Sequence, residues 1–153
     1  MKSLILIFFV YITVFIVGTS FRTANEPIIT EHNCTMAIET IKITIDSKTF
    51  TATLLNNATT KAFKELLPLT IRMTELNGNE KYYDFPESLP TNSSNIDVIQ
   101  KGDIMLYRSN TLVLFYDNFS TSYAYTKIGK INDPTGLAEA LGTGNVSIRF
   151  ENM

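Results

Sequence analysis

The sequence has little of what most enzyme chemistries need. Its 153 residues include no tryptophan, one histidine (His32) and one cysteine (Cys34). A lone cysteine forms no disulfide within the chain, so the domain must fold on its hydrophobic core. Because His32 and Cys34 lie together near the N-terminus, the rest of the chain offers no such ligand for a metal and no partner for a Ser-His nucleophile. We expect no metal and no cofactor.

An excess of positive charge is also missing. The chain carries 13 Lys and Arg against 15 Asp and Glu, a net charge of -2. A nucleic-acid-binding surface needs a concentration of basic residues, so nucleic acid is excluded as an expected partner. The carboxylates of Glu75, Glu80, Glu87 and Asp103 are not paired by a helix or a motif, and hydrolysis by two acids is therefore unsupported.

Residues 1–20 differ from the rest of the chain. Lys2 precedes an apolar run over residues 4–17, and the small residues Gly18 and Ser20 follow it. This order is typical of a secretory signal peptide, with cleavage after Ser20. The alternative is an uncleaved membrane anchor, although a membrane span needs about 20 apolar residues. Either way we expect export, to the periplasm, the cell surface or the medium, with membrane contact only through this segment.

The polar stretch over residues 21–40 is typical of a linker, and we expect the domain to cover residues 41–151. Within it, alternating or continuous apolar segments predict strands. The expected strands cover residues 41–45, 49–55, 69–74, 104–107, 111–116, 122–131 and 146–150.

Two short helices complete the expected fold. Asn57 offers an N-cap for a helix over 58–67, which Pro68 ends, and Asp133-Pro134 begins a second helix that Gly142 ends. Residues 76–101, with Asn77-Gly78-Asn79, Pro86 and Pro90, read as an irregular loop of the kind that often carries function. The expected fold is therefore mainly β, a closed barrel of about seven or eight strands that is capped by two short helices. Where the strands are apolar on both faces, we expect helices to cover the barrel.

Several of these segments resemble the cyclophilin-like superfamily. Residues 41–46 with 51–55 look like its opening hairpin, and 58–66 like its first helix. Ile128-Gly-Lys-Ile131, followed by 136–140, is similar to the Phe-Gly-Lys-Val strand and second helix of cyclophilins.

A closer resemblance is to the bacterial branch of cyclophilin-like family proteins. Its members carry phrases found here at residues 76–82, 89–90, 102–107, 112–116, 119–123 and 125–131. The resemblance spans most of the domain and implies the barrel fold.

The residues of cyclophilin catalysis are mostly absent. Cyclophilins accelerate rotation about the bond before proline, whose barrier is about 18–20 kcal/mol, by placing an arginine near the prolyl nitrogen. In the family that arginine follows Phe-His, whereas here Leu67-Pro-Leu-Thr-Ile precedes Arg72. Aligning Ile128 with the family's Phe puts Tyr125 where its histidine should be.

Three hypotheses follow. The preferred one is a module that binds a proline-containing peptide or a small molecule. The alternative is a weak peptidyl-prolyl isomerase that uses Arg72, and the third is a barrel with only a structural or interaction role. Singly, each candidate residue also suits a solvated surface or the core. The candidate ligand-binding residues are Arg72, Met73, Tyr82, Tyr107, Phe115, Tyr123 and Tyr125.

Overall fold

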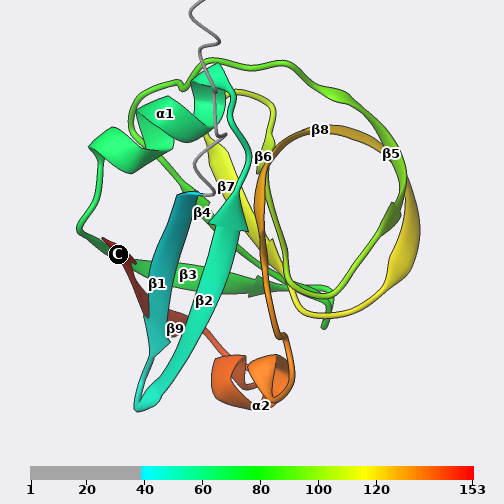
Figure 1. Ribbon diagram of the computed structural model, residues 1–153. Helices are drawn as coiled ribbons and strands as arrows, with labels where there is room; N and C mark the ends of the chain where they lie inside the picture. Colours follow the sequence, from blue (N-terminus) through cyan, green and yellow to red (C-terminus); the bar gives the residue numbers. More distant parts are fainter. Residues whose placement is uncertain (1–38) are drawn as a thin grey trace, which may run out of the picture. The chain divides into compact units, whose positions relative to one another are not determined.

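Nine strands and two helices make up the part of the chain described by the computed structural model, residues 39–153 (Figure 1). The predicted export segment and most of the linker, residues 1–38, lie outside the described residues. Neither helix is long and apolar enough to cross a membrane. The elements are β1 Glu39–Ile45, β2 Lys48–Leu54, α1 Ala58–Glu65, β3 Leu69–Leu76, β4 Glu80–Asp84, β5 Ser94–Ile99, β6 Asp103–Tyr107, β7 Thr111–Phe115, β8 Phe119–Ile131, α2 Leu137–Leu141 and β9 Val146–Asn152.

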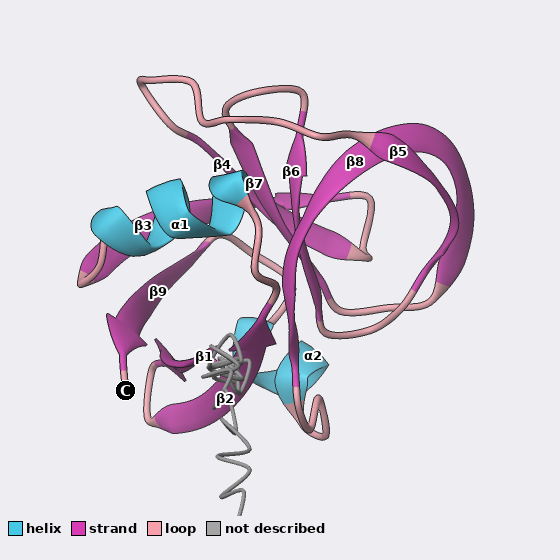
Figure 2. Ribbon diagram, turned by 45° about the horizontal axis from the view of Figure 1, so that its top comes forward, coloured by secondary structure: helices cyan, strands magenta, loops and turns pink. Residues whose placement is uncertain are grey.

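Eight strands close into an antiparallel barrel. Their order is β2-β1-β9-β3-β4-β7-β6-β8, and β8 returns to pair with β2. The ninth strand, β5, pairs only with the first half of β8, outside this ring. The predicted mainly β barrel is confirmed, and α1 and α2 lie at its opposite ends (Figures 1 and 2).

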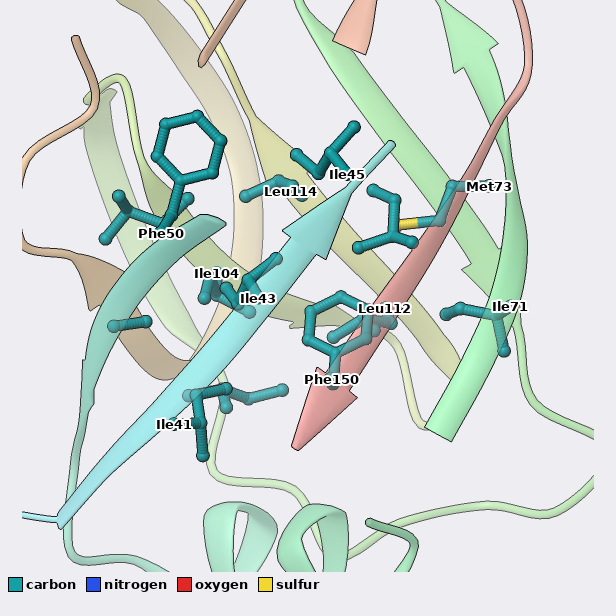
Figure 3. Close-up of a cluster of buried hydrophobic side chains, with 14 of the residues drawn as sticks. Ile41, Ile43, Ile45, Phe50, Ile71, Met73, Ile104, Leu112, Leu114 and Phe150 are labelled. Carbon is teal, nitrogen blue, oxygen red and sulfur yellow. The ribbon is translucent and has the colours of Figure 1, made fainter. Parts of the chain in front are cut away.

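The barrel interior is filled by alternate residues of its strands. Ile41, Ile43 and Ile45 of β1 are fully buried, because every second side chain of a strand points to the same face. They meet side chains of β3, β7 and β9 at the centre (Figure 3). Phe63 brings α1 onto this core by an edge-to-face contact with Phe150, 5.8 Å between ring centroids.

Side chains and backbone set the limits of the two helices. Asn57 caps α1 by accepting a hydrogen bond from the Thr60 N–H at 2.8 Å. The second helix was expected to begin at Asp133-Pro134, but α2 begins at Leu137 after Gly136. The Asp133 carboxylate accepts instead from the Thr135 N–H at 3.0 Å, so it closes a turn before the helix.

The expected loop over residues 76–101 is wrong, since it holds β4 and β5. Asn77 and Gly78 have φ values of 55° and 74° and turn β3 directly into β4. Only residues 85–93 are irregular between β4 and β5.

The apolar strands β6 and β7 are buried on both faces, as expected. One face lines the barrel core. The other lies under a second apolar cluster, to which β5 and β8 contribute Ile99 and Tyr125. This outer face is therefore covered by a two-stranded ribbon, formed by β5 and the first half of β8, and not by a helix. The ribbon curls away beside the barrel (Figure 2).

Barrel closure depends on Gly129. This residue pairs with Leu54 of β2 and Ile104 of β6. A Cβ atom built on it would lie 2.5 Å from the Thr53 carbonyl oxygen and 2.8 Å from Leu54 Cδ2. The glycine of the Ile128-Gly-Lys-Ile131 phrase therefore permits the two strands to meet.

We predict that Gly129→Ala destabilises the protein by about 2–3 kcal/mol, because backbone atoms must move to admit the methyl group. Gly144→Ala is the matched control, since its Cβ would have nothing within 4 Å. Urea unfolding of both variants measures the difference. Equal stability of the two variants would contradict this account of closure.

Candidate functional site

The outer face of β4 and β7 forms the floor of a cavity. In β4, Glu80, Tyr82 and Asp84 alternate with Lys81 and Tyr83, so that three side chains face outward. Tyr82 lies opposite Val113 of β7 in the strand register. The first half of β8 leaves the barrel wall and supplies the facing side of the cavity.

This cavity has a volume of about 850 Å³, within the range of about 300–1,000 Å³ typical of small-molecule sites. Its wall combines tyrosine rings with hydroxyl, amide and charged groups. The lining residues are Leu76, Asn77, Asn79, Glu80, Tyr82, Asp84, Tyr107, Arg108, Asn110, Thr111, Val113, Phe119, Ser120, Thr121, Ser122, Tyr123 and Tyr125.

A continuous row of aromatic rings runs along the cavity. Tyr107 lies 5.8 Å from Tyr123 and 5.5 Å from Tyr125, centroid to centroid. Tyr125 in turn meets Phe115 edge-to-face at 5.5 Å, and Phe115 lies 5.7 Å from Phe119. Tyr107 and Tyr125 are direct cross-strand partners of β6 and β8, so the sheet register itself holds these rings together.

Four of the seven predicted site residues meet in this cavity. Tyr82, Tyr107, Tyr123 and Tyr125 all line it, although they come from three different strands. Tyr123 is 60% exposed at the rim, and Tyr125 is buried. Phe115 lies beneath the lining, fully buried in contact with Tyr125.

The two predicted residues of β3 lie elsewhere. Met73 is fully buried in the barrel core. Arg72 is exposed, pairs across the sheet with Ser147 of β9, and is not among the cavity residues. Alternation along β3 explains both positions, because neighbouring side chains point to opposite faces.

Charged groups of the cavity were not predicted as site residues. They are Glu80, Asp84 and Arg108. Asp84 accepts a hydrogen bond from the Thr111 hydroxyl at 2.5 Å, and the Arg108 guanidinium lies 5.3 Å from the Tyr107 ring centroid. The sequence gives no one-sided pattern that would have marked them, because Lys81 makes the other face of this strand polar as well.

Burial changes the acidity of two cavity groups. Burial raises the pKa of Glu80 above its ordinary value, and the Glu75 carboxylate raises it further. Burial, followed by the charge of Glu80, raises the pKa of Tyr125 to about 12. The Tyr125 hydroxyl therefore stays protonated at neutral pH and is able to donate a hydrogen bond to a ligand.

We predict that Glu80→Gln raises the melting temperature at about pH 7 and that this gain vanishes below about pH 4. The sign follows from the raised pKa. The ordinary pKa of glutamate, expected in the unfolded chain, is 4.5. As the pH rises above this value, the charged form of Glu80 increasingly destabilises the folded state relative to the unfolded one. Thermal unfolding across this pH range measures the effect, with Glu65→Gln on the exposed end of α1 as the control for loss of one carboxylate. A less stable Glu80→Gln protein at neutral pH would contradict it.

On the other side of β4, a buried ammonium group fastens the strand. Lys81 is fully buried, and its Nζ donates to Glu75 and to the carbonyl oxygens of Gly142 and Gly144, at 2.8 and 2.7 Å for the carbonyls. All three ammonium hydrogens thus have acceptors. The Tyr116 hydroxyl also donates to Glu75, at 2.7 Å.

The hydrogen bonds to Glu75 determine whether its carboxylate is charged. Burial alone would raise the pKa of Glu75, but hydrogen bonds from Lys81, Tyr116 and the Gly78 N–H lower it below the ordinary value. Glu75 is therefore charged at neutral pH and neutralises Lys81. The pair ties the β3–β4 turn to the segment between α2 and β9.

We predict that Lys81→Met costs about 3 kcal/mol of stability, because it leaves the partly buried Glu75 carboxylate without its counter-charge and two carbonyls without their donor. Lys61→Met, at an exposed position of α1, is the control and should change stability by less than about 0.5 kcal/mol. Urea denaturation of both variants gives the comparison. A similar small loss in both would show that the buried pair contributes little.

Comparisons with known proteins identify the fold. A sequence model of the family described as "Cyclophilin-like family" matches residues 43–151. Among solved structures, the solution structure of the hypothetical protein AF2241 from Archaeoglobus fulgidus is similar, with a TM-score of 0.56 and 19% identity over 76% of this chain and 95% of that chain. A search of curated proteins finds no match.

Proposed function

This chain belongs to the cyclophilin-like family, and we propose that it is a ligand-binding module whose cavity on the outer face of β4 and β7 takes a small molecule or a peptide segment. The observation that carries the proposal is the convergence of Tyr82, Tyr107, Tyr123 and Tyr125 on one cavity of about 850 Å³. Tyrosine offers apolar area and a hydroxyl on one rigid side chain, and it is favoured where a protein binds a ligand.

The cavity wall supports binding more than it supports a covalent reaction. Ser120 and Ser122 line it, but the only histidine in the sequence, His32, lies outside the described residues. Burial raises the pKa of the Tyr125 hydroxyl to about 12, so this group keeps its proton and suits donation to a ligand. These groups suit recognition by ring contacts and hydrogen bonds.

The alternative, a weak peptidyl-prolyl isomerase, relied on Arg72. An isomerase arginine must reach the prolyl nitrogen of a bound peptide, and Arg72 is exposed on β3 outside the cavity lining. We therefore rank binding above isomerisation. Activity on a proline-containing peptide that disappears in Arg72→Ala would reverse this order.

We also propose that the protein is exported, with residues 1–20 as the signal peptide. The basic residue, apolar run and small residues of this segment support it. N-terminal sequencing of the mature protein tests the proposal, and Phe21 is the first residue expected after cleavage.

We predict that filling the cavity abolishes ligand binding. Thr121 lines the cavity on β8, so Thr121→Trp should occupy the space between the tyrosine rings. The probes are acetyl-Ala-Pro-amide and a set of small aromatic compounds, followed by the NMR signals of the tyrosine rings. At least one probe should shift these signals in the native protein and fail to do so in Thr121→Trp.

The matched control is Thr49→Trp, at an exposed position of β2 away from the cavity. It should bind as the native protein does. The proposal fails if no probe shifts the ring signals, or if Thr121→Trp binds as well as Thr49→Trp.

A further inference from the structure

The Glu80 carboxylate forms no ion pair among residues 39–153. The five ion pairs among residues 39–153 involve other acidic groups. The nearest basic group along the strand, Lys81, points to the opposite face and is already satisfied by Glu75 and two carbonyls. Glu80 thus presents to the cavity a carboxylate that has no ion-pair partner. A carboxylate in a partly desolvated wall costs free energy unless a positive group pairs with it.

The rings around this carboxylate are also suited to a cation. A positive group is attracted to the face of an aromatic ring, most strongly when water is excluded. Tyr82 lies on the same face of β4 as Glu80, and Tyr125 lines the same cavity. The Arg108 guanidinium lies 5.3 Å from the Tyr107 ring centroid, so one ring of the row already has a cation over it.

The charges of the lining point the same way. Glu80 and Asp84 outnumber Arg108 among the charged lining residues. The lining therefore has negative charge in excess, and the complementary ligand carries positive charge.

We propose that the cavity recognises a cationic group, an ammonium or guanidinium, with Glu80 as its counter-ion and the tyrosines Tyr82, Tyr107 and Tyr125 as the aromatic walls around it. The inference rests on the proposed binding function and names the chemical class of the ligand. The cation belongs either to a free small amine or to a lysine or arginine side chain of a peptide.

The test compares three probes that share a benzyl group and differ in charge: benzyltrimethylammonium, benzyl alcohol and phenylacetate. Calorimetric titration and the NMR signals of the tyrosine rings report binding. The cationic probe should bind about tenfold more tightly than the alcohol. Glu80→Gln should remove about this factor for the cation and leave the affinity for the alcohol within about twofold. Glu65→Gln, the matched control on α1, should change neither.

The outcomes separate the two proposals. If the alcohol or phenylacetate binds in the cavity as tightly as the cation, cation recognition is wrong and the cavity remains a binding site. If none of the three probes moves the tyrosine signals, this inference fails, and the cavity proposal then rests on the wider probe set and the Thr121→Trp comparison. Equal loss of cation affinity in Glu65→Gln would also overturn the role given to Glu80.

Two peptides distinguish the sources of the cation. Acetyl-Gly-Lys-Gly-amide and its norleucine analogue have side chains of similar length, and only the first is charged. Tighter binding of the lysine peptide than of both the analogue and benzyltrimethylammonium assigns the site to a basic side chain. Tighter binding of benzyltrimethylammonium assigns it to a free amine.

Discussion

The buried ammonium of Lys81 is the constraint on which the candidate site depends. Its bonds to Glu75, Gly142 and Gly144 leave no freedom in the register of β4. Side chains alternate along a strand, so placing Lys81 inward obliges Glu80 and Tyr82 to face outward. A slip of one residue would expose the ammonium and bury Glu80 and Tyr82. The ion pair on one side of β4 thus determines the chemistry presented on the other.

The cavity exists because β8 contributes to two parts of the fold, the barrel wall and the ribbon that it forms with β5. The second half of β8 is part of the barrel wall, where Gly129 allows it to approach β2 closely. Its first half turns away and pairs with β5. Register shifts, between Ile104 and Met105 against β8 and between Asn95 and Asp97 in β5, accompany this change of direction. Bulges bend and twist strands, which suits a strand that leaves the barrel wall. The cavity lies between the first half of β8 and the outer face of β4 and β7.

Regular apolar alternation made most of the fold predictable, and its interruption explains what was missed. The isoleucines of β1 and the apolar runs of β6 and β7 have the period that strands require. β4 escaped because one of its two core-facing residues is Lys81, which is acceptable there only because the fold brings Glu75 to it. The tyrosines could be named from their residue type, yet their convergence depends on sheet order. Arg72 is the opposite case, a predicted site residue that lies outside the cavity. The resemblance to cyclophilins singled it out, but the alternation of β3 places it elsewhere.

The residue types in the cavity support the proposed binding function better than a role in packing alone. Phenylalanine would fill the space beside Phe115 and Val113 as well as tyrosine does, without hydroxyl groups to satisfy. Glutamine at position 80 would keep the shape without the cost of holding a charge in a partly dry wall. Stability alone therefore gives no reason for Glu80, whereas it does for Lys81, whose ammonium is fully paired. A residue that costs stability in the empty protein is expected where the cost is recovered by a bound partner.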